Sequence, residues 1–210
     1  MGVKLRALLL VLIAGLAPGA ARAANNADGA EAFVNGMVTA ALKTLRDPAM
    51  TEAERERRLG QLLVQDFDTA RIARYVLGRY WMVASPGERR DFARLFRDWA
   101  VRSYAARMVQ YSNETVKVTG ARPESDTDAV VTSEITHPAG PATRVGWRVS
   151  HRTGAYRIID VDVEGVSMAL TERDEIAATI QRSGGTVAAL NRTLAGKLHD
   201  EIATAQPAHP

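Results

Sequence analysis

The sequence predicts an α+β fold: a twisted, mostly antiparallel sheet of four to five strands, with helices from both ends of the chain packed on it. Apolar residues recur at helical spacing up to about Tyr111 and again after Thr171. Between Asn113 and Val163 they instead alternate with polar residues, as in strands. The turns between these strands are short, which favours an antiparallel meander with the helices on one face.

Each of the first three helices has a recognisable beginning or end. The first carries its apolar residues from Phe33 to Leu45. The boundary signals are Asp47-Pro48 after the first helix, a capping box of Thr51 and Glu54 before the second, and Asp68 before and Gly78 after the third. These signals predict three helices connected by short loops.

A long fourth helix is predicted from Ser85 to about Tyr111. Ser85-Pro86-Gly87-Glu88 places Ser at the N-cap, Pro at the first helical position and Glu at the third. The stripe that includes Phe92, Phe96 and Trp99 lies roughly 100° from a second stripe of Tyr104, Met108 and Tyr111. Two apolar faces imply either two neighbouring elements or one neighbour and a ligand.

Four segments read as strands and two more as helices. The strands are expected at Thr115–Thr119, Ala129–Thr136, Thr143–Ser150 and Tyr156–Val163. Thr171 and Asp174 are expected to cap a helix that contains Ile176 and Ile180. Ser183-Gly184-Gly185 ends it, and a last helix reaches Leu198.

Residues 1–23 have the three regions of a cleavable export signal. Lys4 and Arg6 precede an apolar run from Ala7 to Leu16, and Ala21-Arg22-Ala23 fits the pattern cut by signal peptidase. The run is shorter than the roughly 20 residues that span a bilayer. We expect cleavage after Ala23, one domain at 24–202 and a disordered tail at 203–210. With no cysteine to carry a lipid anchor, the processed protein should be free in solution outside the cytoplasm.

The basic charge of the chain belongs to this signal. The sequence has 27 Lys and Arg against 24 Asp and Glu, and removal of Lys4, Arg6 and Arg22 leaves 24 against 24. A processed chain of zero net charge gives no reason to expect nucleic-acid binding. The lack of cysteine also excludes disulfides and cysteine-ligated zinc.

Two motifs with possible chemistry are better explained by structure. Gly165-Val166-Ser167-Met168-Ala169 is close to a hydrolase nucleophile elbow, for which Asp174 and His199 would complete a triad. The final glycine is replaced by Ala, however, and the chain lacks the alternating β/α pattern of such enzymes. We therefore interpret the segment as the exit from a strand, and expect no enzyme activity.

Asp160, Asp162 and Glu164 alternate along a predicted strand and could present oxygens to a hard cation. A solvated strand face, with Ile159, Val161 and Val163 buried behind it, is the simpler interpretation. The four histidines show no ligand spacing. We expect no metal and no cofactor.

Two blocks of sequence resemble the MlaC (toluene-tolerance) family of periplasmic phospholipid-binding proteins. The first runs from Val76-Leu77-Gly78-Arg79-Tyr80-Trp81 through Ala84-Ser85-Pro86 and Glu88 to Phe92 and Phe96, with Tyr104 and Tyr111 matching later tyrosines. The second is Asp160-Val161-Asp162-Val163-Glu164-Gly165-Val166-Ser167. The resemblance covers roughly residues 30–200.

The resemblance implies a periplasmic carrier that holds a glycerophospholipid in an apolar pocket and shuttles it between the outer and inner membranes. It implies as partners an inner-membrane ABC transporter with an MCE-type subunit and an outer-membrane lipoprotein–porin complex, which would mediate any membrane contact. We expect a monomer whose only bound molecule is its phospholipid cargo. The alternative is a hopanoid-associated or other lipid carrier of the same superfamily. A Ser167-type hydrolase and a ligand-free envelope scaffold are weaker alternatives.

Apolar and aromatic residues on the facing elements are the candidates for the pocket wall. They are Phe33, Met37, Leu62, Tyr75, Val76, Tyr80, Trp81, Phe92, Phe96, Trp99, Tyr104, Met108, Tyr111, Val131, Ile135, Trp147, Val149, Val161 and Val163.

Overall fold

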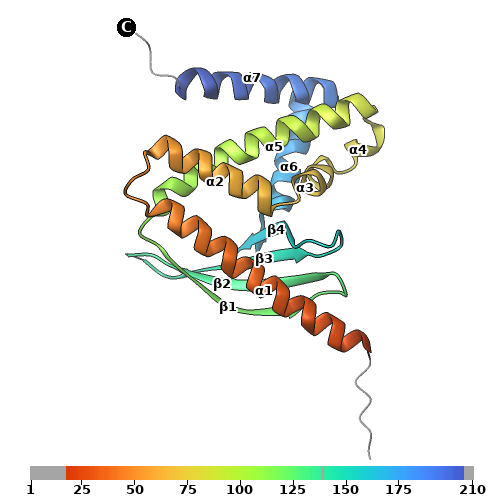
Figure 1. Cartoon of the computed structure of the whole chain (residues 1–210). Coiled ribbons are helices and arrows are strands. Elements are labelled where there is room, and N and C mark those ends of the chain that lie inside the picture. Colours follow the sequence, from red (N-terminus) through yellow and green to blue (C-terminus); the bar gives the residue numbers. More distant parts are fainter. Residues whose placement is uncertain (1–17, 139, 206–210) are drawn as a thin grey trace, which may run out of the picture.

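The computed structural model describes residues 18–138 and 140–205 (Figure 1). Its helices are α1 Pro18–Leu45, α2 Glu52–Asp66, α3 Thr69–Leu77, α4 Tyr80–Val83, α5 Pro86–Met108, the 3₁₀ turn η1 Val109–Tyr111, α6 Met168–Arg182 and α7 Val187–Ala205. Its strands are β1 Thr115–Pro123, β2 Asp128–Thr136, β3 Thr143–Ser150, β4 Arg157–Val163 and β5 Val166–Ser167. Most of the predicted export signal lies outside the described residues, and its last six residues form the beginning of α1.

The predicted α+β class is confirmed. The five strands lie side by side in chain order, and each pairs antiparallel with the next, which is the expected meander. β1 continues to Pro123, beyond the expected end at Thr119, because the register shifts between Val118 and Gly120. A bulge of this kind lets a strand bend and still keep its partner.

Three helix starts are confirmed by their caps. The Thr51 hydroxyl accepts a hydrogen bond from the Glu54 N–H at 3.3 Å, and the Glu54 carboxylate accepts one from the Thr51 N–H at 2.8 Å. Ser85 and Glu88 form the same reciprocal pair at the start of α5. The Asp68 carboxylate accepts from the Arg71 N–H at 2.9 Å. These side chains satisfy backbone donors that the first helical turn leaves free.

The expected start of α6 is wrong by one turn. The helix begins at Met168, and the Ser167 hydroxyl accepts a hydrogen bond from the Leu170 N–H at 3.1 Å. Thr171 lies inside the first turn, where its hydroxyl donates to the Ser167 carbonyl oxygen. At the other end of the chain, α7 continues to Ala205, and residues 206–210 of the expected tail lie outside the described residues.

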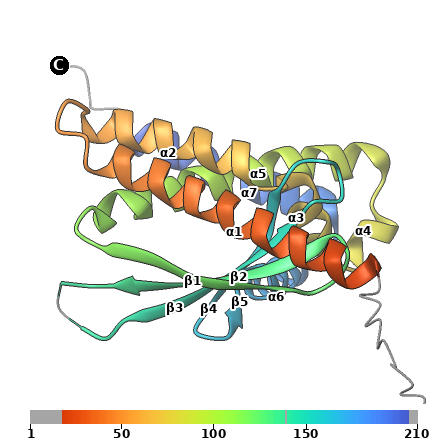
Figure 2. The same cartoon turned by 60° about the horizontal axis from the view of Figure 1, so that its bottom comes forward.

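The helices form layers on one side of the sheet, as both views show (Figures 1 and 2). α1 crosses the sheet and buries Val34 against Val131 and Val149. Its C-terminal end packs with α2 and α5 around Leu59. A third apolar cluster, centred on Phe92, joins α3 to α7 and places α7 on the outside.

A bulge in β4 ties the helical layer to the sheet. Arg148 pairs with Asp160 while the adjacent Val149 pairs with Ile158, so Ile159 is the extra residue. The expectation that Ile159 faces the core is therefore wrong, because the bulge gives that position to the fully buried Ile158. The Ile158 carbonyl oxygen accepts a hydrogen bond from the Asp68 N–H at 2.9 Å, at the junction of α2 and α3.

Phe92→Ala should strongly destabilise the fold. The Phe92 side chain is fully buried and stacks on Phe96 with ring centroids 5.6 Å apart. Replacement of a buried phenylalanine by alanine typically lowers the free energy of unfolding by about 3–5 kcal/mol. Urea denaturation measures this loss. Met82→Ala, at a side chain 75% exposed, is the control and should change stability by less than about 0.5 kcal/mol.

Candidate functional site: an apolar cavity between helices and sheet

A cavity of about 520 Å³ lies between the helical layer and the sheet. The lining comes from helices α1, α2, α3, α5 and α6, the turn η1 and strands β1 to β4, and most of it is apolar. The lining side chains are Met37, Val38, Ala41, Leu42, Leu45, Leu59, Leu62, Leu63, Asp66, Phe67, Thr69, Ile72, Phe96, Arg97, Ala100, Val101, Tyr104, Met108, Tyr111, Glu114, Val116, Ile135, His137, Thr143, Val145, Trp147, Asp160, Val161, Val163, Met168, Ala169 and Glu172.

One face of the sheet serves both the core and the cavity. Side chains alternate along a strand, so Val131 and Ile135 of β2 point to the same face. α1 packs on Val131, whereas Ile135 lies further along the strand and lines the cavity. On β3, Val149 packs beneath α1 and Trp147 lines the cavity, although Trp147 also contacts the cluster under α1. The cavity therefore occupies the part of this face that α1 leaves uncovered.

About half of the candidate pocket residues line this cavity. They are Met37, Leu62, Phe96, Tyr104, Met108, Tyr111, Ile135, Trp147, Val161 and Val163. They come from α1, α2, α5, η1 and strands β2 to β4. The second apolar stripe of α5, with Tyr104 and Met108, meets the cavity, and Phe96 of the first stripe joins it there.

The other candidates lie elsewhere. Phe33, Val131 and Val149 pack beneath α1, and Val76, Tyr80, Trp81, Phe92 and Trp99 belong to the cluster of α3 to α7. Tyr75 is 46% exposed on α3. Much of the first family-like block, from Val76 to Phe92, thus builds the fold beside the cavity and not its wall.

Sequence reasoning missed a large share of the lining. Leu42 and Leu45 were visible as part of the helical stripe of α1, and Leu59 and Leu63 as part of that of α2. Their spacing shows that they are buried, not what they face. Asp160 was noticed only as part of an acidic row and a family-like block, and most of the other polar lining residues gave no signal. Asp66 is one example: its side chain is buried, accepts a hydrogen bond from Gln65, and has a pKa raised by that burial.

A half-buried hydrogen bond joins two walls of the cavity. The Tyr104 hydroxyl on α5 donates to the Glu172 carboxylate on α6 at 3.0 Å. Burial, reinforced by the Glu172 charge, raises the pKa of Tyr104, so that the phenol keeps its proton. Burial also raises the pKa of Glu172, by disfavouring its charged form. The pair provides polarity within an otherwise apolar wall.

A second polar group lies where β1, β2 and β3 meet the cavity. One imidazole nitrogen of His137, Nδ1, lies 2.8 Å from the Glu114 carboxylate, and Nε2 lies 3.0 Å from the Thr143 hydroxyl. Arg46 at the end of α1 donates to the carbonyl oxygens of Ser112 and Glu114. These bonds attach the end of α1 to the segment that leads into β1.

Asp160 and Ser167 act together at the start of α6. Ser167 donates its hydroxyl proton to Asp160 at 2.6 Å, and Asp160 also accepts from the Ala169 N–H at 3.0 Å. Both contacts stabilise the helix N-terminus, where free N–H groups favour a negative charge. Asp162 accepts from the Gly165 N–H, and Glu164 from the Arg144 N–H. The acidic row thus organises the turn from β4 into α6.

Within residues 18–138 and 140–205, no group of three or more acidic or histidine side chains is arranged to hold a metal ion. Across the same ranges, no helix combines the length and apolar character that a membrane span requires.

The comparisons with known proteins agree on one family. A family model described as MlaC protein matches residues 35–195. The toluene tolerance protein Ttg2D of Pseudomonas putida is 24% identical over 118 residues, which are 56% of this chain and 54% of that protein. The chain thus matches about half the length of this curated relative.

A solved structure shares the fold. It is the phospholipid-binding protein of Ralstonia solanacearum, determined in complex with a phospholipid. The TM-score is 0.70 at 25% sequence identity, and the match covers 81% of this chain and 97% of the other.

Glu172→Gln should change how stability depends on pH. Because the pKa of Glu172 in the folded state is raised above its ordinary 4.5, its contribution to stability is complete below that value and is lost as the pH rises through the folded-state pKa. Glutamine does not titrate and can still accept from Tyr104. Urea denaturation between about pH 4 and pH 8 should show the wild type losing stability relative to the variant. A constant difference over this range would contradict the assignment.

Ser167→Ala should weaken the start of α6. Loss of a serine N-cap typically lowers the free energy of unfolding by about 1 kcal/mol, and here Asp160 also loses a donor. Thermal or urea denaturation measures the change. Ser167→Thr keeps the hydroxyl and is the control, which should retain most of the stability. Equal losses in the two variants would rule out a capping role.

Proposed function

Because this chain belongs to the MlaC family, we propose that it is a periplasmic carrier that takes a glycerophospholipid into its cavity and shuttles it between the outer and inner membranes. The observation that carries this proposal is the apolar cavity of about 520 Å³ between the sheet and the helices. The phospholipid bound by the Ralstonia solanacearum protein, which has the same fold, supports the class of ligand. The predicted export signal supports the compartment.

The energetics favour an occupied cavity. Enclosed unfilled volume costs about 24 cal/mol per Å³, so a dry void of this size would cost on the order of 10 kcal/mol, which is an upper limit here because the pocket is partly open to solvent. That value is comparable with the entire stability of a typical domain. Acyl chains remove the cost by filling the volume, because they supply apolar contacts to every wall.

The same energetics limit how tightly a carrier binds. Each CH₂ group withdrawn from water contributes ~0.8 kcal/mol, so the transfer of an acyl chain of about 16 carbons from a membrane into water costs ~12 kcal/mol. The lipid begins and ends in a membrane, however, which is as apolar as the cavity. A useful carrier must match the membrane closely, since a much better pocket would never release its cargo.

The remaining components of the proposal follow from the family. A carrier that receives and delivers lipid needs partners at both membranes. We propose an inner-membrane ABC transporter with an MCE-type subunit and an outer-membrane lipoprotein–porin complex. The protein itself would act as a processed monomer without enzymatic activity, and phospholipid would be its only cargo.

Ala100→Trp should remove bound lipid. Ala100 lines the cavity from α5, and an indole there occupies volume that acyl chains need. Native mass spectrometry of the purified wild type should show a co-purified phospholipid, and the variant should carry at least tenfold less. Ala106→Trp, at an exposed position on the same helix, is the matched control and should keep the lipid. Circular dichroism verifies that both variants fold.

Other outcomes would identify other functions. A wild type without bound lipid would favour a ligand-free scaffold. A bound hopanoid in place of a phospholipid would indicate the sister branch of the superfamily. Lipid hydrolysis that disappears in Ser167→Ala would indicate an esterase, whereas a carrier with that substitution continues to bind and exchange lipid.

A further inference from the structure

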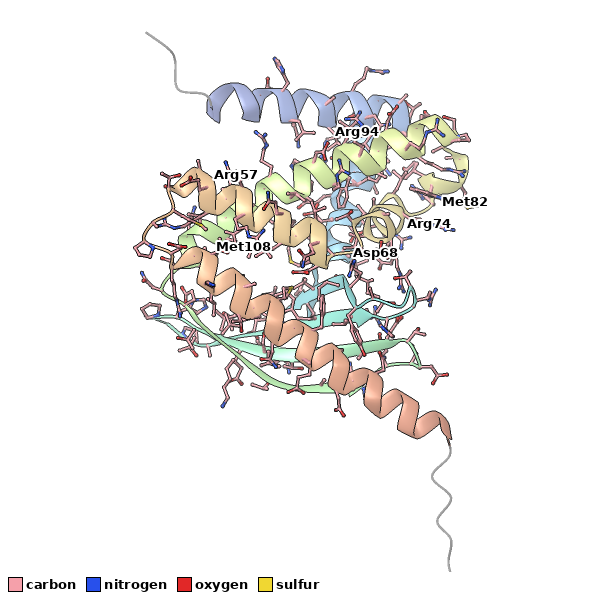
Figure 3. The ribbon with its side chains drawn as sticks, viewed as in Figure 1. Arg57, Asp68, Arg74, Met82, Arg94 and Met108 are labelled. Atoms are coloured by element: carbon pink, nitrogen blue, oxygen red, sulfur yellow. The ribbon has the colours of Figure 1, made fainter. Side chains whose placement is uncertain are left out.

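The corner formed by α3, α4 and the start of α5 is rich in arginine. Between Thr69 and Arg90 the sequence contains five arginines and a single acid, Glu88, which the capping box with Ser85 engages. Figure 3 shows Arg74 and Met82 at this corner, whereas Arg57 lies apart from them on α2. Arg71 is paired with Asp128 of β2, and the remaining arginines give this corner its positive charge.

Aromatic rings hold these arginines in place. The guanidinium carbons of Arg74 and Arg89 lie 5.8 and 5.7 Å from the centre of the Trp81 ring. Arg79 lies 5.0 Å from the Tyr80 ring, and Arg173 of α6 lies 5.4 Å from that of Tyr75. Cation–π contacts orient a guanidinium and leave its charge in place.

Carboxylates leave these four charges unpaired. In the described part of the chain, none of Arg74, Arg79, Arg89 and Arg173 forms an ion pair. Arg148, by comparison, is paired with Glu124 at 2.6 Å. The corner thus presents positive charge that an external anion can neutralise.

Two apolar side chains project from the middle of this charge. Met82 and Val83 are 75% and 79% exposed, the most exposed of the large apolar side chains in the described residues. They lie on α4, a single turn bounded by Gly78, whose φ is 56°, and by Ala84. Exposure of adjacent large apolar residues at one tip costs solvation free energy unless the tip meets an apolar environment.

We propose that this corner docks on the surface of an anionic phospholipid bilayer. The three kinds of side chain in this patch match three depths of a leaflet. Exposed aliphatic side chains suit the acyl boundary, aromatic rings suit the interfacial zone, and arginines suit the anionic head groups. Met82 and Val83 enter the leaflet, Trp81 and Tyr80 lie at its interface, and the arginines contact the phosphates. None of these residues lines the cavity, so the inference does not depend on the proposed function.

Trp81 fluorescence provides a local test. The chain has three tryptophans, and Trp99→Phe with Trp147→Phe leaves Trp81 as the only emitter. Vesicles of phosphatidylglycerol with brominated acyl chains should quench its emission, and brominated phosphatidylcholine vesicles should quench it far less. Flotation of the chain with all three tryptophans on the same vesicles gives a second readout that does not depend on these two substitutions.

Variants at the patch separate its two components. Met82→Asp with Val83→Asp should abolish quenching, whereas Val64→Asp, at an exposed apolar site on α2, should not. Arg74→Gln with Arg79→Gln should weaken vesicle binding on the order of 30-fold, whereas Arg57→Gln with Arg58→Gln should have little effect. Unquenched Trp81 on anionic vesicles, or equal losses in patch and control variants, would overturn the proposal. An acidic protein that binds the corner while vesicles do not would also overturn it.

Discussion

The bulge of strand β4 joins the helical layer to the sheet by a main-chain hydrogen bond, and the rest of the architecture depends on that junction. Arg71 of α3 adds side-chain bonds to Ser150 of β3 and Asp128 of β2. The Asp68 N–H donates to the Ile158 carbonyl oxygen at the β4 bulge, and two residues later Asp160 receives the start of α6. At the opposite edge, α1 packs on β1 and β2 through an apolar cluster that includes Val34 and Val131. Between these two lines of attachment the layers are held apart, and the cavity lies there.

The same geometry explains why one face of the sheet forms part of the core at one end and the cavity wall at the other. A sheet face of uniform apolar character would ordinarily be covered completely, because exposed apolar surface is unfavourable. Here α1 crosses at one end only, and α2, α5 and α6 stand behind the uncovered part. The resulting wall includes the Tyr104–Glu172 pair, in which burial raises the pKa of both side chains by disfavouring their charged forms. The site is thus a volume that the helices surround and do not fill.

Local signals in the sequence predicted the helices and strands well. Capping boxes at Thr51 and Ser85 and the glycine at 78 act over a few residues, so their effect can be read directly. The start of α6 was misplaced because Asp160, on a preceding strand, supports Ser167 through contacts that no local pattern contains. The inward position of Ile158 was missed for a similar reason, since a bulge at Ile159 reverses the alternation.

The cavity wall was predictable only in part. Val161 and Phe92 are both apolar and both fit the periodic pattern of their own element, a strand and a helix, yet one lines the cavity and the other is packed on every side. The difference depends on whether a neighbouring element fills the space opposite, which is a property of the assembled layers. The polar wall residues Asp66, Glu114 and Glu172 were unpredictable because each is tolerated through a partner distant in sequence or through a shifted pKa.

The continuity of α1 has a mechanical consequence. Phe33 and Val34 sit in the cluster that fixes this helix to the sheet, and Leu45 lies at the far end of the cavity wall. With a rise of about 1.5 Å per residue, roughly 18 Å of helix separates the two. A tilt of about 10° around the fixed cluster would displace the far end by about 3 Å. Such a tilt would widen the cavity without the loss of a backbone hydrogen bond within α1, but it would have to break or carry along the Arg46 hydrogen bonds to Ser112 and Glu114 that hold this end.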